Sequence, residues 1–201
     1  MEYISILKSN FRESISTKEK FLLEEDILKT FDSIVSAVVR SLQSGGRIYI
    51  AGNGGSAADA QHLAGEFTSR LCRERRPLPA EALSVDTSTL TAIANDYGYE
   101  HVFSRQLLGK LLKTDCFIAF STSGNSANIV RALETCRDKG GTAILFTGSN
   151  GGKASLISDF TIRVPSNTTT IIQEVHIMLV HSLCQCVEEK LFFYNEQGDM
   201  K

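Results

Sequence analysis

Hydrophobic residues in this chain form short continuous runs and longer stretches in which they recur every three or four positions. A short apolar run has the length of a buried strand, and the longer period is that of an amphipathic helix. The two alternate, which is typical of a parallel sheet with helices on both faces. The runs predict five strands, at residues 47–51, 80–85, 116–120, 143–146 and 160–164. The predicted fold class is therefore α/β, a three-layer sandwich around a five-stranded parallel sheet of flavodoxin-like order.

Two amphipathic helices are predicted before the first strand. The second of them stops at Gly45, as helices commonly do at glycine. We expect residues 1–45 to form an N-terminal helical extension, used either as a packing layer or in oligomerisation. The sequence has no internal repeat, low-complexity segment or linker, so residues 1–201 are predicted to form a single domain. The apolar positions of the first helix are Tyr3, Ile4, Leu7, Phe11 and Ile15.

Charge and composition narrow the class of partner. The 21 Lys and Arg residues against 23 Asp and Glu give a net charge of −2, which provides no basic field for nucleic acid. The chain starts without a cationic leader, and its sequence has no uncharged apolar stretch of about 20 residues, so we expect no membrane partner and a cytoplasmic location. Five scattered cysteines without a C-x-x-C pair indicate reduced structural thiols.

A glycine turn follows the first predicted strand, with the sequence Gly-Asn-Gly-Gly-Ser at residues 52–56. Such a turn brings backbone N–H groups close to an anion, and the dipole of the next helix favours the same charge. Ser56 is expected to cap that helix. His62 and Glu66 lie four residues apart and so share one face of it, where they offer a base and a metal ligand, although Glu66 alone would also suit a solvated position.

A second turn follows the third predicted strand, with the sequence Ser-Thr-Ser-Gly-Asn-Ser at residues 121–126. Hydroxyls and free N–H groups at a helix start hold a phosphate without Lys or Arg, although the same residues also make an ordinary helix cap. Residues 148–154 are one residue short for a P-loop, and residues 52–57 lack the third glycine of a dinucleotide site. We therefore expect a sugar phosphate rather than ATP or NAD.

The order and spacing of several motifs identify a resemblance. The chain resembles the sugar isomerase (SIS) domain proteins and, among them, the phosphoheptose isomerases, over nearly its whole length. The motifs that carry the resemblance are residues 52–56, 59–62, 95–98, 121–126, 163–165 and 173–176, together with Glu66 and His181.

The resemblance implies an aldose-ketose isomerase that converts sedoheptulose 7-phosphate to D-glycero-D-manno-heptose 7-phosphate, a precursor for bacterial lipopolysaccharide or capsule. It also implies a homotetramer with active sites shared between subunits. Glu66 and His181 match the acid/base pair of the family, and one zinc ion per subunit is expected at His62, Glu66, Gln173 and His181. The expected substrate contacts are Asn53, Gly54, Gly55, Ser56, Glu66, Asn95, Asp96, Ser121, Thr122, Ser123, Ser126 and Gln173.

The chemistry agrees with that resemblance. Moving a carbonyl between neighbouring carbons needs a group that takes a proton from one carbon and returns it to the other, and a carboxylate with an imidazole suits this task. Zinc would polarise the carbonyl oxygen, although turnover without metal stays open. Two alternatives also stay open: a non-catalytic SIS adaptor that binds a partner protein, and an isomerase or lyase for another sugar phosphate.

Three details of the sequence lead to further expectations. Gln173 and His181 lie eight residues apart on one predicted helix, about 12 Å along its axis, so we expect a neighbouring subunit to supply one of them or the helix to be irregular at Gln173. The arginines of residues 70–76 are expected to form a solvated loop. Residues 168–172 are Thr-Thr-Thr-Ile-Ile where some relatives carry an Asp and an Arg ahead of the matching Gln. The hydroxyl of Thr170 can donate a hydrogen bond there but carries no charge, so substrate positioning, the anomer released and a preference for a related sugar phosphate stay open.

Overall fold

A computed structural model describes residues 2–193, and within this range the strands form one parallel sheet. Its five strands lie in the order β2-β1-β3-β4-β5, so the predicted flavodoxin-like order is confirmed. The expectation that residues 1–201 form one domain includes Met1 and residues 194–201, which lie outside the described range. The strands are β1 (Ile48–Gly52), β2 (Ala80–Ala82), β3 (Cys116–Ser121), β4 (Thr142–Thr147) and β5 (Phe160–Arg163).

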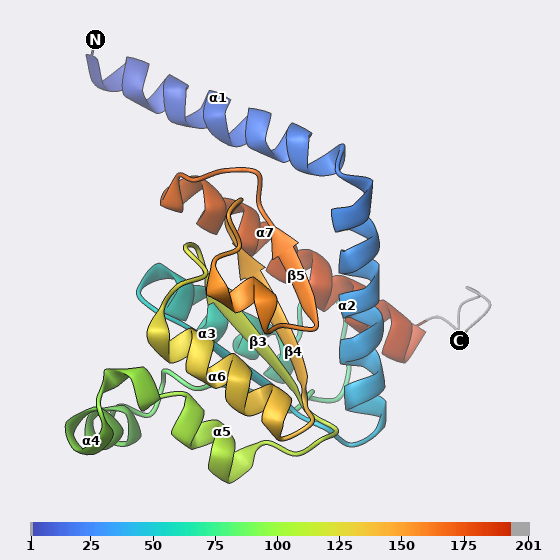
Figure 1. The fold of residues 1–201 in the computed structure, drawn as a ribbon. Coiled ribbons are helices and arrows are strands. Elements are labelled where there is room, and N and C mark those ends of the chain that lie inside the picture. The colour runs from blue at the N-terminus through green and yellow to red at the C-terminus, as the bar shows by residue number, and fades with distance from the viewer. Residues whose placement is uncertain (1, 194–201) are drawn as a thin grey trace.

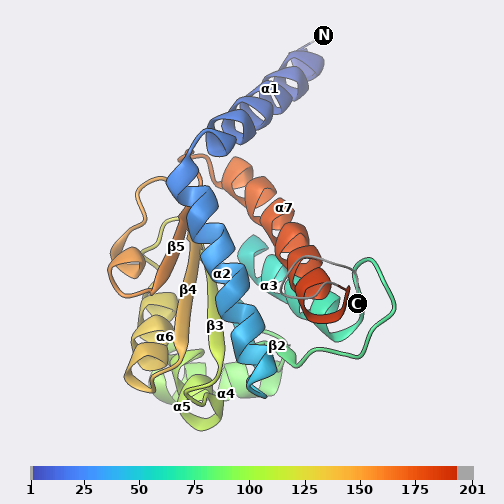
Figure 2. The ribbon, with the colours of Figure 1, turned by 90° about the vertical axis from the view of Figure 1, so that its right-hand side faces the viewer.

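Helices cover both faces of the sheet, which confirms the three-layer prediction (Figure 1). Figure 2 shows α2 and α7 on the same side of the sheet, with α3 beside α7. One face carries α2 (Glu25–Gln43), α3 (Gly55–Thr68) and α7 (Thr169–Glu188), and the other carries α4 (Thr87–Tyr97), α5 (Ser104–Lys110) and α6 (Ala127–Asp138). The short turns are η1 (Tyr99–His101), η2 (Lys153–Leu156) and η3 (Glu189–Phe193).

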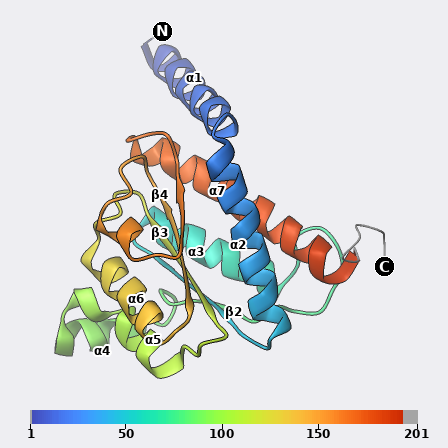
Figure 3. The same cartoon turned by 45° about the vertical axis from the view of Figure 1, so that its right-hand side comes forward.

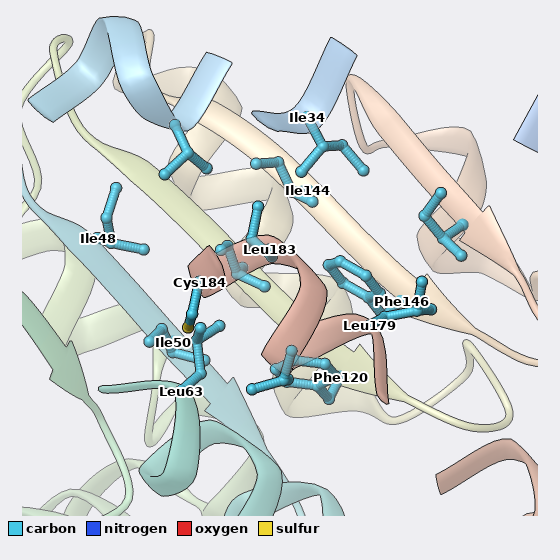
Figure 4. Close-up of a cluster of buried hydrophobic side chains, with 14 of the residues drawn as sticks. Ile34, Ile48, Ile50, Leu63, Phe120, Ile144, Phe146, Leu179, Leu183 and Cys184 are labelled. Atoms are coloured by element: carbon cyan, nitrogen blue, oxygen red, sulfur yellow. The ribbon is translucent and has the colours of Figure 1, made fainter. Parts of the chain in front are cut away.

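Alternation along the strands divides the core into two. In β1, Ile48 and Ile50 pack toward α2, α3 and α7, whereas Tyr49 and Ala51 pack toward α5 and α6. This follows from the two-residue period of side chains in a strand. Leu63 contributes to the first cluster, which Figure 4 shows gathering between the sheet and its helices. Both faces of the central strands are buried, which is why those strands are continuous apolar runs.

The α7 helix is the most apolar part of this core. Together with η3 it is long and apolar enough, by length and composition, to cross a membrane, but 50% of that window is buried inside the protein. One apolar stripe of α7 is buried against the sheet, as expected for a core helix. That stripe consists of Ile172, Val175, Leu179, Leu183 and Val187.

The second strand is shorter than predicted. It ends at Ala82 rather than at residue 85, and it pairs only with β1, at the edge of the sheet. Asp86 then caps α4 by accepting a hydrogen bond from the backbone N–H of Thr89 at 2.9 Å. The residues between Ala82 and Asp86 therefore lead the chain into a helix instead of extending the strand.

The first helix, α1 (Glu2–Leu22), projects away from the sandwich (Figure 3). Only its second half packs on the rest of the chain, where Ser14, Thr17 and Phe21 are buried near the start of α7. The predicted apolar stripe faces solvent within this one subunit, with Tyr3 85% and Phe11 62% exposed.

Candidate active site at the carboxyl ends of the strands

The two predicted phosphate turns meet at the carboxyl ends of β1 and β3. These strands are neighbours, and Gly52 lies opposite Phe120 in their ladder. The strand order reverses between them, since β2 lies on one side of β1 and β3 on the other. A crevice at such a switch point is the usual ligand site of an open α/β sheet.

The first turn needs glycine at two positions for different reasons. Gly54 has a φ of 56°, a left-handed conformation that favours glycine, and it forms the N-cap of α3. At Gly55 an added Cβ would lie 2.5 Å from Nε2 of Gln173, so the missing side chain makes room for that amide. Ser56 was expected to cap α3, but the helix starts at Gly55 and Ser56 is buried in its first turn. That prediction is wrong because the glycines allow the helix to start two residues earlier, with Gly54 as its N-cap.

The second turn has hydroxyl groups free for a ligand. Ser126 stands at the N-cap of α6 without a side-chain capping bond. The hydroxyl of Ser121 is buried and has no hydrogen-bond partner within the described structure. Thr122, Ser123 and Asn125 of this turn line a pocket of about 300 Å³. Its other walls were not predicted as parts of the site: Asn150, Asn167, Thr169 and Ile172. Thr169 lines it from the start of α7.

A reciprocal amide pair joins the two turns. Nδ2 of Asn53 donates to Oδ1 of Asn128, and Nδ2 of Asn128 donates to Oδ1 of Asn53, both at 2.9 Å. Tyr99 donates to the same oxygen of Asn53 at 3.2 Å. Asn128 was not predicted, although a polar residue on the buried side of the first turn of a helix is an available signal.

The predicted chemical groups gather where α3 passes α7. Nε2 of His62 lies 3.3 Å from Oε1 of Glu66 and 3.0 Å from Nε2 of His181. The two imidazole rings meet edge to face. The side chain of His62 is 42% exposed and that of Glu66 is 22% exposed, so a solvent-borne substrate can reach them. His62 is thus the middle member of a row of three ionisable side chains.

Gln173 joins a different part of the site. Its amide lies over Gly55, one end of α3, whereas His181 contacts His62 about two turns further along. The helix α7 is continuous from Thr169, so the predicted irregularity at Gln173 is wrong. Both residues reach α3 of their own subunit because the two helices lie side by side.

These donors suit zinc in kind. Zinc binds imidazole nitrogen and carboxylate oxygen, and two nitrogens on one tetrahedral ion lie about 3.3 Å apart, close to the spacing of the two Nε2 atoms. As placed, residues 2–193 hold no group of three or more His, Cys, Asp or Glu side chains that could bind a metal ion. Nε2 of His62 makes the contact with Glu66 and also the contact with His181. A zinc ion bound to this atom would therefore stand in place of both direct contacts.

Asn95 and Asp96 lie on the last turn of α4, apart from this row. Both are exposed, and Nδ2 of Asn95 donates to Oδ1 of Asp96 at 2.9 Å. The following turn, η1, connects this segment to the glycine turn through Tyr99 and Asn53. Asn95 and Asp96 are therefore close in sequence to Tyr99, whose hydroxyl reaches the glycine turn at Asn53.

Two buried titratable groups lie behind the site. Burial raises the pKa of the Asp59 carboxyl to about 6, against the opposing effect of His62. Burial likewise lowers the pKa of His176 to about 4, which keeps its ring neutral between Phe120 and Phe146. The complete burial of His176 makes it part of the core rather than a group open to substrate.

Comparison with known proteins shows the family to which the chain belongs. Residues 11–148, which include both turns, match the SIS domain family. The phosphoheptose isomerase of Aneurinibacillus thermoaerophilus is 50% identical over 186 residues, covering 92% of this chain and 94% of that protein. Phosphoheptose isomerase 2 of Campylobacter jejuni is 46% identical over 188 residues, 94% of each protein. The structure of a phosphoheptose isomerase from Francisella tularensis has a TM-score of 0.90 and 33% identity, and the match covers 94% of this chain and 100% of that one. The chain therefore belongs to the SIS domain family and, within it, to the phosphoheptose isomerases.

Proposed function

We propose that this protein is an aldose-ketose isomerase that converts sedoheptulose 7-phosphate to D-glycero-D-manno-heptose 7-phosphate. The observation that carries the proposal is the row Glu66, His62 and His181 on α3 and α7. The helix α3 starts at the glycine turn, and Thr169, the first residue of α7, lines the pocket at the second turn. A phosphate held at the turn of residues 121–126 leaves the other end of a sugar chain free to extend toward this row. The presence of Glu66 and His181 argues against the non-catalytic adaptor.

In the proposed reaction, Glu66 removes a proton from C1 of the ketose. Charge then develops on O2, and His181 stabilises it by giving a proton to that oxygen. The resulting enediol loses the proton on O1 to His181 while Glu66 returns its proton to C2. Atoms and electrons balance, since both groups end in the state in which they began. His62, which contacts both groups, orients them.

We also propose a zinc ion at His62, Glu66 and His181. Zinc bound there would supply a positive charge that polarises a carbonyl oxygen. Gln173, held over Gly55 in the same chain, would bind the substrate rather than the ion. The test is metal analysis of the purified protein beside its His62→Asn variant, where loss of zinc from the variant alone supports the site and equal zinc in both contradicts it.

We further propose a cytoplasmic homotetramer with shared active sites, which supplies a heptose precursor for lipopolysaccharide or capsule. The exposed apolar stripe of α1 supports assembly, because its side chains are left uncovered by their own subunit. A second copy of the chain would cover this stripe. It would also add its residues to a site that is open on one side.

Turnover of sedoheptulose 7-phosphate, followed by NMR, tests the function. We expect Glu66→Gln to lose at least about 10²-fold in kcat, and Glu25→Gln, on the exposed start of α2, to lose nothing. Tight sugar-phosphate binding without turnover by the unmodified protein would favour the adaptor. Full turnover by Glu66→Gln would remove Glu66 as the base.

A further inference from the structure

Arg75 and Glu188 form an ion pair that is almost fully buried, with side chains 1% and 2% exposed. Nη2 of Arg75 lies 2.8 Å from Oε1 of Glu188, and Nε donates to the same oxygen at 3.0 Å. The basic segment at residues 70–76 was expected to be a solvated loop, and for Arg75 this is wrong. Its neighbour Arg76 is exposed, so the two arginines have different roles.

The guanidinium of Arg75 completes the carboxyl end of α3. The last carbonyl groups of a helix have no partner inside it, and a positive charge there also interacts favourably with the helix dipole. Nη2 of Arg75 donates to the backbone oxygen of Glu66 at 2.7 Å, and Nη1 donates to those of Phe67 at 2.6 Å and Ser69 at 2.9 Å. Arg75 therefore holds the turn of α3 that carries Glu66.

Glu188 fastens the other helix to the same segment. It is the last residue of α7, and its carboxylate accepts hydrogen bonds from the backbone N–H groups of Leu71 at 2.8 Å and Cys72 at 3.2 Å. Burial by itself would raise the pKa of Glu188, but these N–H groups and Arg75 outweigh it and hold the pKa below its ordinary value. The charged form is thus the one that the fold stabilises.

The Arg75–Glu188 pair lies on the same side of α7 as His181. His181 and Glu188 are seven residues apart, which places them on the same face of α7 and about 10 Å from each other. Figure 2 shows α3 beside α7 in this region. The two helices therefore make the His62–His181 contact, and two turns further along α7 Glu188 pairs with Arg75 in the loop that follows α3.

We propose that the Arg75–Glu188 pair is a positioning device that sets α3 against α7 and thereby fixes Glu66 and His62 relative to His181. This inference rests on the proposed function. A buried ion pair adds little net stability over well-packed apolar residues, so stability alone does not account for it. The need to hold the catalytic groups in place does account for the pair, because a misplacement of about 1 Å in such groups can lower the reaction rate by about 10²-fold.

Steady-state kinetics of Arg75→Lys and Glu188→Gln test the proposal, with Arg76→Lys as the matched control. A lysine cannot serve three carbonyl groups and a carboxylate together, because it lacks the planar fork of arginine. We expect kcat to fall at least about tenfold in both variants while KM for the sugar phosphate changes less than about twofold. We expect KM to be retained because the phosphate turns lie near the amino end of α3, whereas Arg75 binds its carboxyl end. The control should match the unmodified protein.

Imidazole NMR signals give a second readout in the same proteins. The chain has four histidines, and a shift of α3 against α7 would move the signals of His62 and His181 while leaving that of His101 in place. A merely structural pair would not produce this pattern. Circular dichroism and the molecular mass in solution establish that each variant is folded at the assay temperature.

Either result can overturn the proposal. Unchanged kcat in a folded Arg75→Lys or Glu188→Gln protein would do so, as would a loss of kcat that only follows the unfolded fraction. If Arg75→Lys does not fold, the kcat of the Glu188→Gln protein decides whether the proposal stands. Failure of the proposed function itself would look different, because then Glu66→Gln would keep its turnover or the unmodified protein would have none.

Discussion

Nε2 of His62 lies 3.0 Å from Nε2 of His181, although 119 residues separate them in the chain. At this distance one ring can donate a hydrogen bond to the other, and the tautomers decide which ring donates. His62 also contacts Glu66, which makes it the link between the two groups assigned to proton transfer. The relationship depends on α3 and α7 lying side by side, and the predictions below test what maintains it and what it serves.

Replacing the linking residue should slow the reaction. We expect His62→Asn to lower kcat by about 10²-fold, because Glu66 and His181 lose the group that orients both. Steady-state kinetics measure this, with His101→Asn, on the separate turn η1, as the control. Equal kcat for His62→Asn and the unmodified protein would remove His62 from the site.

Adding a methyl group to the glycine turn should disturb Gln173. In Gly55→Ala the new Cβ would meet the Gln173 amide, so we expect KM for the sugar phosphate to rise about tenfold or more while the fold is retained. Gly65→Ala is the matched control on the same helix, since its Cβ would meet nothing within 4 Å. The control should keep its KM and gain up to about 1 kcal/mol in the free energy of unfolding. A normal KM for Gly55→Ala would mean that Gln173 does not contact the substrate.

Removing one partner of the amide pair should weaken the turn that carries Asn53. We expect Asn128→Ala to cost about 1–2 kcal/mol in the free energy of unfolding and to raise KM, because Asn53 loses a donor and an acceptor. A double-mutant cycle with Asn53→Ala measures the coupling. Additive effects of the two substitutions on KM would show that the pair does not act as a unit.

The buried carboxyl of Asp59 predicts a stability difference that depends on pH. Its pKa is raised to about 6 in the folded protein, so the folded state binds the proton more tightly and loses stability as pH rises from about 4 through 6. Asn cannot ionise. Relative to the unmodified protein, Asp59→Asn should therefore gain stability as pH rises, by at most about 3 kcal/mol above pH 7. Denaturant unfolding at pH 4.5 and pH 8 measures this, and a difference that does not grow with pH would contradict it.

The exposed stripe of α1 predicts a change in assembly. If a second copy covers this stripe, Phe11→Ser should reduce the molecular mass in solution without unfolding the chain, because Phe11 has few contacts to lose within its own subunit. Arg12→Ser, next to it on the exposed helix, is the control. Light scattering after gel filtration gives the mass. The same mass in both variants would remove this stripe from the interface.

Much of the fold could be predicted because its signals are local. The runs at Ile48 and Cys116 are apolar throughout since both faces of central strands are buried, and the glycine turn and hydroxyl turn follow those strands directly. The end of β2 could not be predicted, because the cap that Asp86 provides competes with the strand pattern before it. The same holds for Ser56, where backbone freedom at Gly54 moved the start of the helix.

The sequence by itself determined the α/β class, the two turns and the His62–Glu66 face, because each depends on local patterns along the chain. Only the tertiary structure decided which distant side chains meet. It placed His181 at His62, Gln173 over Gly55, Asn128 at Asn53 and Arg75 at Glu188. Arg75 was misassigned for that reason, since its partner is 113 residues away. Hydrophobic periodicity shows which face of a helix is buried. The packing of distant segments on one another decides which partner a buried charge such as Arg75 has.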